Sequence, residues 1–189
     1  MEALKALKER RTVRKFTSKP VSAELFDEII ECARLAPYPA NIQPLKFAVI
    51  TEKSGLLFKY TKWAGYLENG TPSESERPFG YIVTLGDKNI KKNADFETEA
   101  SIAGAVMSVA AHALGLGTCW LGAIDREGIK KELEIPECFD VLYLLAVGYP
   151  AQESTAVEMK DDIKYYLSGE KLCVPKRSRE EIIYTPGKE

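Results

Sequence analysis

The sequence predicts an α+β protein in which helices flank a mixed sheet of four or five strands. Apolar runs of strand length alternate with segments of helical spacing, and a long stretch of small apolar residues predicts a central helix. With 189 residues, 45% of them hydrophobic and 29% charged, the chain fits one globular domain over 1–189. Because strands and helices alternate in the second half, a doubly wound sheet stays open as an alternative.

Two helices are expected near the N-terminus. Apolar residues recur at helical spacing at Ala3, Leu4 and Leu7, so the first helix is predicted to run into the arginine cluster that follows. In the second, Ser22 is the expected N-cap, and Val21 is expected to pack against Phe26. Its inner face is formed by Leu25, Ile29, Ala33 and Ala36. Pro37 ends it, because a residue before proline resists the helical conformation.

The four strands are expected at 46–51, 81–87, 118–124 and 141–150. Between the second and third, a helix is predicted over about 95–114, with Gly115 and Gly117 as its candidate C-caps. Asp125 is expected to cap a short helix that Pro136 ends. Residues 54–78 have a weak pattern rich in turn formers.

Beyond Pro150 the chain turns polar, and we expect a C-terminal arm over about 151–189. Within it, "EEIIYT" (180–185) has a β-like pattern without a local partner. Such a segment is expected to pair with another chain.

Composition narrows the functional classes. The four cysteines, spread without metal or disulfide spacing, are expected to be buried free thiols, and the single His112 is expected to be a packed residue. No apolar run reaches the roughly 18 residues of a membrane span, so we expect no membrane partner and a cytoplasmic location. Residues 1–19 carry seven basic and two acidic side chains in a chain of net charge −2. This local excess favours a small anion over nucleic acid, which needs a broad basic surface.

The basic excess centres on "RRTVRKF" (10–16). On a helix, Arg10 and Arg14 would share one face while Arg11 points about 100° away. Two guanidinium groups and the Thr12 hydroxyl suit a single terminal phosphate. From these residues alone, a solvated basic face is equally acceptable.

A second candidate stretch is "APYPANIQPLKF" (36–47). Pro37 and Pro39 stiffen the backbone, and Asn41 and Gln43 offer amide donors and acceptors. A rigid loop that carries amides suits a planar heteroaromatic ligand, although an ordinary helix-to-strand connection explains the same residues. The glycines of "GLGTCWLG" lead from a helix into a strand, the opposite of the order in a dinucleotide fingerprint.

Taken together and in order, "RRTVRKF", "ARLAPYPANIQPLKF", "GLGTCWLGAID" and "KRSREEIIY" resemble the FMN-dependent nitroreductase family. The resemblance runs from Arg10 to about Tyr184, while residues 63–78 have no matched motif. It implies a nitroreductase-like α+β fold and a homodimer with two FMN molecules at the subunit interface. It also implies that the C-terminal segment reaches across the partner.

The resemblance also implies a set of cofactor-binding residues and no catalytic side chain. The phosphate and ribityl side of FMN would be held by Arg10, Arg11, Thr12 and Arg14, completed from the tail by Lys176 and Arg177. The flavin would be lined, from the other subunit, by Pro37, Tyr38, Pro39, Asn41 and Gln43. Backbone N–H groups of Gly122 and Ala123 would face flavin N5 and O4.

The implied activity is transfer of reducing equivalents from NADH or NADPH, through FMN, to a nitroaromatic or quinone acceptor. Both substrates would use one slot in turn, which gives ping-pong kinetics, and the flavin would carry the chemistry. Two alternatives stay open. The same fold supports reductive dehalogenation, alkene reduction and flavin degradation, and a small anion- or nucleic-acid-binding module would use the basic cluster without flavin.

Overall fold

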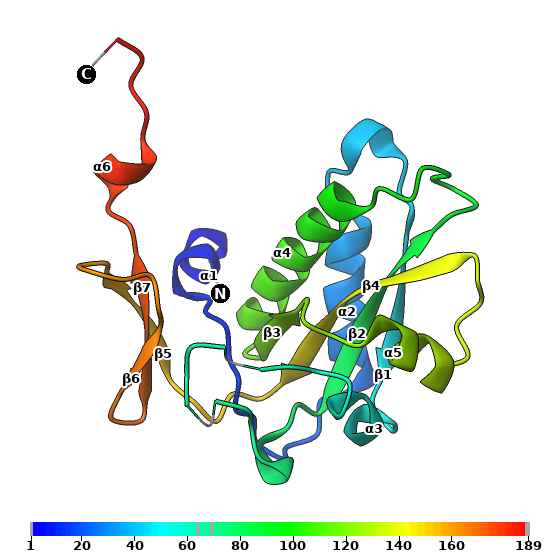
Figure 1. Cartoon of the computed structure of the whole chain (residues 1–189), viewed down its shortest axis with the longest axis horizontal. Coiled ribbons are helices and arrows are strands. Elements are labelled where there is room, and N and C mark those ends of the chain that lie inside the picture. Colours follow the sequence, from blue (N-terminus) through cyan, green and yellow to red (C-terminus); the bar gives the residue numbers. More distant parts are fainter. Residues whose placement is uncertain (1, 64, 69, 188–189) are drawn as a thin grey trace.

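The computed structural model describes residues 2–63, 65–68 and 70–187. Figure 1 shows a main body of helices around a sheet, with the C-terminal arm beside it. The helices are α1 (Ala3–Glu9), α2 (Ala23–Arg34), α3 (Ser54–Phe58), α4 (Glu97–Ala113), α5 (Arg126–Glu132), α6 (Arg179–Ile182) and the short 3-10 turns η1 (Pro39–Asn41) and η2 (Glu74–Glu76). The strands are β1 (Leu45–Ile50), β2 (Gly80–Asp87), β3 (Gly117–Leu121), β4 (Phe139–Gly148), β5 (Ser154–Glu158), β6 (Tyr166–Ser168) and β7 (Lys171–Lys176).

Four strands form the main sheet in the order β1-β2-β4-β3, and every neighbouring pair is antiparallel (Figure 1). The α+β class and the strand number are therefore confirmed, whereas the doubly wound alternative is wrong because it requires parallel neighbours. Parallel pairing, expected of a mixed sheet, joins β5 to β7 in a separate three-stranded sheet. It also occurs at a single bridge between Thr12 and Thr118, at the β3 edge of the main sheet.

Both faces of the main sheet are covered. Helices α2 and α4 pack on one face, where Phe26, Ile29 and Met107 meet Ile82. The other face is covered by α3, α5 and the chain that follows α1, which contribute Leu57, Ile129, Val13 and Phe16. Strand β2 lies between these layers, and all eight of its residues are buried. A central strand buried on both faces explains its nearly continuous apolar sequence.

The expected helix signals are found in α2, α4 and α5. Val21 and Phe26 share one buried cluster, and Asp125 accepts a hydrogen bond from the Gly128 N–H at 3.0 Å. Ser22 holds the N-cap position of α2, but its side chain makes no bond to the helix backbone. Gly115, with a φ of +81°, directly follows Leu114 at the end of α4, which confirms it as the glycine that terminates this helix.

Three expectations about local structure are wrong. Helix α1 ends at Glu9, so the arginine cluster is not helical and Arg10 and Arg14 share no helix face. Strand β3 ends at Leu121 instead of Ile124. The "EEIIYT" segment begins inside α6, where Ser178 and Glu181 form a capping box that favours a helical turn over a strand.

One face of α4 is not covered within a single chain. Ala105 is exposed on it, and Val106 and Val109 are only half-buried. Together with α1 and α2 this face lines an apolar groove of about 340 Å³. On the opposite side of α4, Gly104 lies against the ring of Trp120, where a Cβ atom would overlap the indole. Over the residues that the structure describes, no helix combines the length and apolarity that crossing a membrane requires.

Candidate functional site

The arginine segment runs along the edge of the main sheet instead of continuing α1. Thr12 bridges to Thr118 of β3, and the Val13 N–H donates to the Thr118 carbonyl at 2.8 Å. In extended chain, side chains alternate between two sides. Val13 is buried in the core, so Thr12 and Arg14 face the side opposite to it.

The charge of this segment is not neutralised. Arg11 donates through Nη1 to the Arg10 carbonyl at 2.6 Å, while its buried Nε finds no partner in the described part of the chain. Burial, and then the neighbouring Arg11 charge, hold the pKa of Arg10 below its usual value. Among the described residues, no carboxylate forms an ion pair with Arg10, Arg11 or Arg14. Half-buried cations without a carboxylate partner are costly, and an anion would compensate them.

Arg14 is covered by an aromatic side chain from the C-terminal arm. Its guanidinium carbon lies 4.3 Å from the centre of the Tyr165 ring, and that ring lies 5.0 Å from the ring of Tyr66. The N-terminal segment, the middle segment and the arm therefore meet at one point. Sequence reasoning missed both tyrosines, and only the aromatic doublet Tyr165–Tyr166 in a polar tail could have drawn attention to them.

His112 lies beside the same arginines. Its pKa is lowered, mainly by burial and also by the charges of Arg10 and Arg11, while Glu9 acts in the opposite direction. Its Nε2 is buried and makes no hydrogen bond to any residue in the described ranges. A packed, neutral histidine agrees with the expectation for this residue.

The proline-rich loop is conformationally strained. Ala40, Asn41 and Gln43 have φ angles of 47°, 53° and 53°, a region that non-glycine residues rarely occupy. Gln43 donates through Nε2 to the Asn41 side-chain oxygen at 2.9 Å, so both exposed amides are held together. Strain of this kind gathers at ligand-binding sites. The loop is thus a candidate site with preorganised amide groups.

Tyr38 points the other way, into the protein. Its hydroxyl donates to the Ala33 carbonyl at 2.6 Å, and burial raises its pKa. Pro37 and Pro39 are exposed beside it. The ring also forms one wall of a hollow of about 260 Å³, together with Ile30, Arg34, Gln43, Leu45, Lys46 and Phe47.

Gly122 and Ala123 form a turn directly after β3. The half-buried Gly122 lies over Tyr143, and Ala123 is exposed. The Ala123 carbonyl accepts a hydrogen bond from the Lys62 N–H at 3.0 Å. Within residues 2–63, 65–68 and 70–187, no acceptor is found for the Ala123 N–H. The turn therefore presents a backbone donor at the protein surface.

One chain does not bring all these residues together. Figure 1 shows the loop between α2 and β1 at the upper end of the molecule, remote from the segment that descends from α1. Lys176 and Arg177 are exposed at the end of β7, and Arg177 lies 3.3 Å from Glu181. Helix α6 and the chain beyond it project away from the main sheet (Figure 1).

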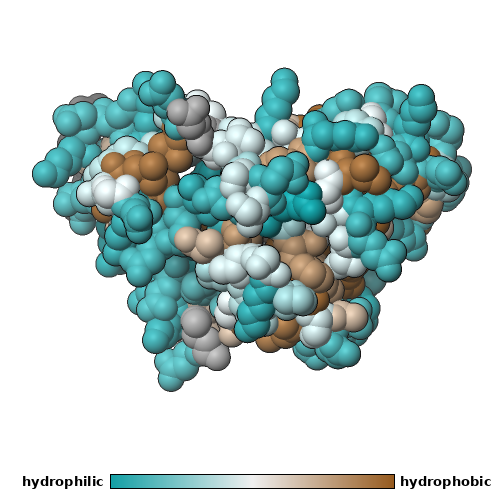
Figure 2. Space-filling model, turned by 90° about the horizontal axis from the view of Figure 1, so that it is seen from below, coloured by the Kyte–Doolittle hydropathy of each residue, from teal (hydrophilic) through white to brown (hydrophobic). Residues whose placement is uncertain are grey.

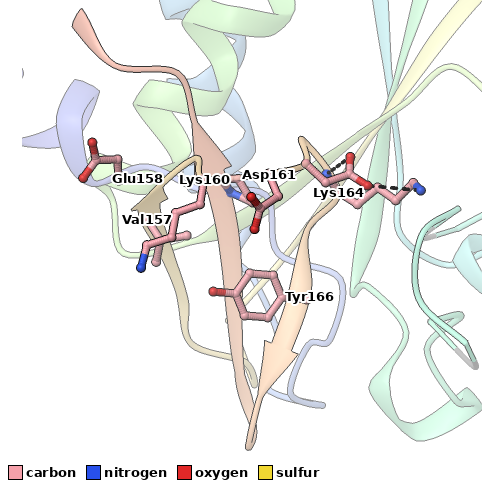
Figure 3. Close-up of a pocket in the computed structure, with 8 residues that line it drawn as sticks. Val157, Glu158, Lys160, Asp161, Lys164 and Tyr166 are labelled. Atoms are coloured by element: carbon pink, nitrogen blue, oxygen red, sulfur yellow. Dashed lines mark hydrogen bonds and ion pairs between the residues drawn. The ribbon is translucent and has the colours of Figure 1, made fainter.

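A hollow of about 460 Å³ lies in the arm and contains none of the predicted site residues. Figure 3 shows Tyr166 pointing into it, with Lys160, Asp161 and Lys164 around it. Lys164 pairs with Asp162 at 3.1 Å, and Glu158 and Asp161 further balance the lysines. Without an excess of positive charge, this hollow does not suit a phosphate.

Comparisons with known proteins match the chain to one family model and to several named relatives. It matches the model of the Nitroreductase family over residues 7–77 and 75–149. A protein of Methanothermobacter thermautotrophicus, whose name couples NADH dehydrogenase with NAD(P)H nitroreductase, is 31% identical over 172 residues, 88% of this chain and 87% of that protein.

Two solved structures extend the similarity to the fold. One, with the same name and from Parabacteroides distasonis, has a TM-score of 0.70 at 26% identity and covers 98% of both chains. The other, an FMN-dependent nitroreductase from Clostridium difficile, has a TM-score of 0.64 at 30% identity and covers 79% of this chain and 88% of that one.

Proposed function

The chain belongs to the Nitroreductase family, and on this premise we propose that it binds FMN and transfers reducing equivalents from NADH or NADPH to nitroaromatic or quinone-type acceptors. An NAD(P)H-dependent oxidoreductase is the function that its relatives support. The proposal includes FMN as the cofactor, the class of acceptor, a ping-pong order of substrates and a cytoplasmic location.

The observation that carries the proposal is the uncompensated charge at Arg10, Arg11 and Arg14. A phosphate monoester fits this donor set, since guanidinium groups bind its oxygens in bidentate fashion and a hydroxyl such as that of Thr12 adds one further donor. The orphaned Nε of Arg11 is a donor that such an anion would satisfy. In a dimer, Lys176 and Arg177 of the second copy would add two exposed cations.

The ring end of FMN would lie between two rigid backbone segments. The strained loop, from the second copy, would present Asn41 and Gln43, with Pro37 and Pro39 at its edge and the backbone of Tyr38. The turn at Gly122 and Ala123 would present backbone N–H groups to the ring edge. When bound, FMN would supply the redox chemistry, the transfer of reducing equivalents from the reduced nicotinamide to the acceptor.

Two planar substrates that share one face of a ring must use it in turn, so we expect ping-pong kinetics. The proposed reaction needs no protein acid or base, so no such role is assigned to the packed His112. All four cysteines are free thiols, which suits a reducing compartment.

A second copy of the chain would cover apolar surface that one chain leaves open. On α1, Leu4 and Leu7 are 70% and 57% exposed beside the apolar groove of α4. The arm exposes further large apolar side chains at Ile163, Tyr166, Leu167, Ile182, Ile183 and Tyr184. In Figure 2, hydrophobic residues reach the surface both on the body and on the left side, where the arm lies. Apolar surface of this extent is typical of interfaces.

The function is tested by colour and by electron transfer. We expect the purified protein to be yellow, to bleach under anaerobic conditions with NADH or NADPH, and to regain its colour with a nitrofuran or menadione. A colourless protein whose spectrum does not change with excess FMN would refute the proposal. Bleaching by neither nucleotide would refute the proposed electron donor while leaving FMN binding intact.

The dimer is tested with a charge in the apolar groove. Leu7→Glu is expected to yield monomers in sedimentation velocity and to release FMN, because half of each site would come from the partner. Leu56→Glu is the matched control, since Leu56 is 42% exposed on α3, away from the groove. A Leu7→Glu protein that stays dimeric would exclude this face as the interface.

A further inference from the structure

The turn after β3 is held in place from the outside by the segment 60–62. The Asp125 N–H donates to the Tyr60 carbonyl at 2.9 Å, and the Lys62 N–H donates to the Ala123 carbonyl at 3.0 Å. A β-bridge between Thr61 and Ile124 lies between these two bonds. Three successive contacts fix the position of the turn.

From beneath, the turn rests on a fixed aromatic ring. A Cβ on Gly122 would lie 3.2 Å from Cε1 of Tyr143, tighter than ordinary contact. This ring cannot easily retreat, because the Tyr143 hydroxyl donates to the Glu97 carboxylate, with both oxygens within 2.7 Å, and Trp120 packs edge-on at 5.0 Å. Glycine therefore lets the backbone lie directly on the ring.

These contacts fix where the turn lies, but the peptide plane between Gly122 and Ala123 could still rotate. Arg126 restricts this rotation. Arg126 donates through Nη2 to the Gly122 carbonyl at 3.3 Å and to the Leu142 carbonyl of β4 at 2.9 Å. The Ile124 N–H donates to the same Gly122 oxygen at 3.1 Å. The guanidinium thus links the turn after β3 to the neighbouring strand.

The direction of the Ala123 N–H follows from peptide geometry. In a planar trans peptide, the C=O of one residue and the N–H of the next point in opposite directions. Because the Gly122 oxygen faces Arg126 and Ile124, the Ala123 N–H points away from both. It is the donor for which no acceptor is found in the described ranges.

The presence of an arginine at position 126 is not explained by a contribution to the stability of helix α5. It is the first residue of α5, where a positive charge is disfavoured by the helix dipole. Its side chain is exposed and is not part of an ion pair with any described residue. An unfavourable local choice is expected where a residue serves a functional site.

We propose that Arg126 is a positioning residue, which fixes the Gly122–Ala123 peptide so that the Ala123 N–H is a preorganised donor to the ring edge of bound flavin. The inference rests on the proposed function, because it assigns the acceptor to FMN. Arg126 acts through the peptide and does not touch the ligand itself. A donor that is held in place loses little entropy on binding, which is how preorganisation raises affinity.

The test separates the ring end from the phosphate end by comparing FMN with riboflavin, which lacks the phosphate. Arg126→Met is expected to lower the affinity for both flavins by the same factor. This factor is about two- to tenfold, which corresponds to the loss of one neutral hydrogen bond. Arg14→Met is expected to weaken the binding of FMN more than that of riboflavin. Affinities are measured by quenching of flavin fluorescence, and circular dichroism verifies that each variant is folded.

Two further variants test whether the effect is due to charge alone and whether a conservative substitution restores flavin binding. Lys131→Met removes an exposed cation from the same helix and is expected to bind both flavins like the wild type. Arg126→Lys keeps the charge and a donor but carries it on a flexible stem instead of a rigid planar group, so we expect partial recovery. The visible absorption band of bound flavin is expected to shift in Arg126→Met, because a ring-edge hydrogen bond has changed.

The outcomes are distinct. If the wild type binds neither flavin, the proposed function fails and the role toward flavin fails with it. If the wild type binds both and Arg126→Met gives the same riboflavin affinity and the same spectrum, only the positioning inference fails. A loss confined to FMN, or an equal loss in Lys131→Met, would also overturn it, because the effect would then be one of charge.

Discussion

Replacing Arg10 by methionine should weaken FMN binding without weakening the protein itself. Arg10 is half-buried with a pKa that burial and Arg11 hold low, so the folded chain disfavours its charged form. Methionine keeps the apolar stem and removes the charge. We therefore expect the flavin-free variant to melt at the same temperature as the wild type or higher, and to lose the cation that a phosphate needs.

The size of the effect follows from binding linkage. A hydrogen bond to a charged group contributes about 1.5–3 kcal/mol, so the affinity should fall about ten- to hundredfold. FMN at 100 times the wild-type Kd stabilises the wild type by about 2.7 kcal/mol. The same concentration would stabilise the variant by about 1.4 to 0.4 kcal/mol. For a chain of this size, 1 kcal/mol corresponds to about 2–4 °C in Tm.

Differential scanning fluorimetry with and without FMN measures both quantities. Lys8→Met is the matched control, because it removes an exposed cation two residues away, in the last turn of α1. An Arg10→Met protein with the full FMN-induced rise in Tm would refute the phosphate assignment. A flavin-free variant that melts well below the wild type would refute the view that this charge is uncompensated in the folded chain.

Three further predictions concern neighbouring residues. Tyr165→Leu should destabilise the protein by about 0.5–2 kcal/mol, because the cation–π contact with Arg14 is lost. A double-mutant cycle with Arg14→Met, measured by urea unfolding, should reveal a coupling energy between the two residues. If the free-energy changes of the two single variants simply add, the contact contributes nothing to stability. Gly104→Ala should cost about 1–3 kcal/mol or more by forcing the new methyl into the Trp120 ring, and an unchanged urea midpoint would contradict this packing. For His112, whose folded pKa is lowered, the unfolded chain takes up the proton first, so stability is full above about pH 6.5 and falls as the pH drops below it. His112→Gln should flatten that part of the stability profile, and an unchanged slope would contradict the lowered pKa.

Local signals in the sequence were sufficient to predict the structure wherever residues close along the chain determine it. Asp125 caps α5 because the backbone N–H of Gly128 lies one turn away. Gly115 ends α4 because a left-handed residue is needed there. The apolar run of β2 is buried on both faces, as its composition indicates. In each case the determining contact spans only a few residues or is a property of burial.

The arginine segment was mispredicted because distant contacts determine its structure. Its helical spacing continues that of α1, but the Val13 N–H finds its acceptor in Thr118, and Phe16 finds its own in Glu76. Pairing with an already formed strand edge outweighs a weak helix propensity over a few residues. In the extended segment, Thr12 and Arg14 flank the buried Val13, so the side chains of these two residues lie on the side opposite to it.

The arm was beyond sequence reasoning for a related reason. Strands β5, β6 and β7 are short. Strand β5 is mostly half-buried, β6 is exposed, and β7 buries only the adjacent Leu172 and Cys173, so none shows the alternation that marks a strand packed on a core. They are held by pairing with one another, parallel for β5 and β7 and antiparallel for β6 and β7. Such mutual pairing leaves little trace in the sequence of any single strand.

The proposed dimer with bound FMN would explain two features of the single chain: cations without carboxylate partners and apolar surface that is left uncovered. The cations of 10–14 lack carboxylate partners among the described residues, and the strained amides of Asn41 and Gln43 lie at the other end of the body. The proposed ligand, with an anionic tail and a planar polar ring, would need both groups. In the proposed dimer, a second copy related by a two-fold axis would supply the missing group at each of two sites. The exposed leucines of α1 and the open face of α4 are the surface that such a copy would bury. Cofactor binding and dimerisation should therefore be coupled, each raising the apparent affinity of the other by mass action.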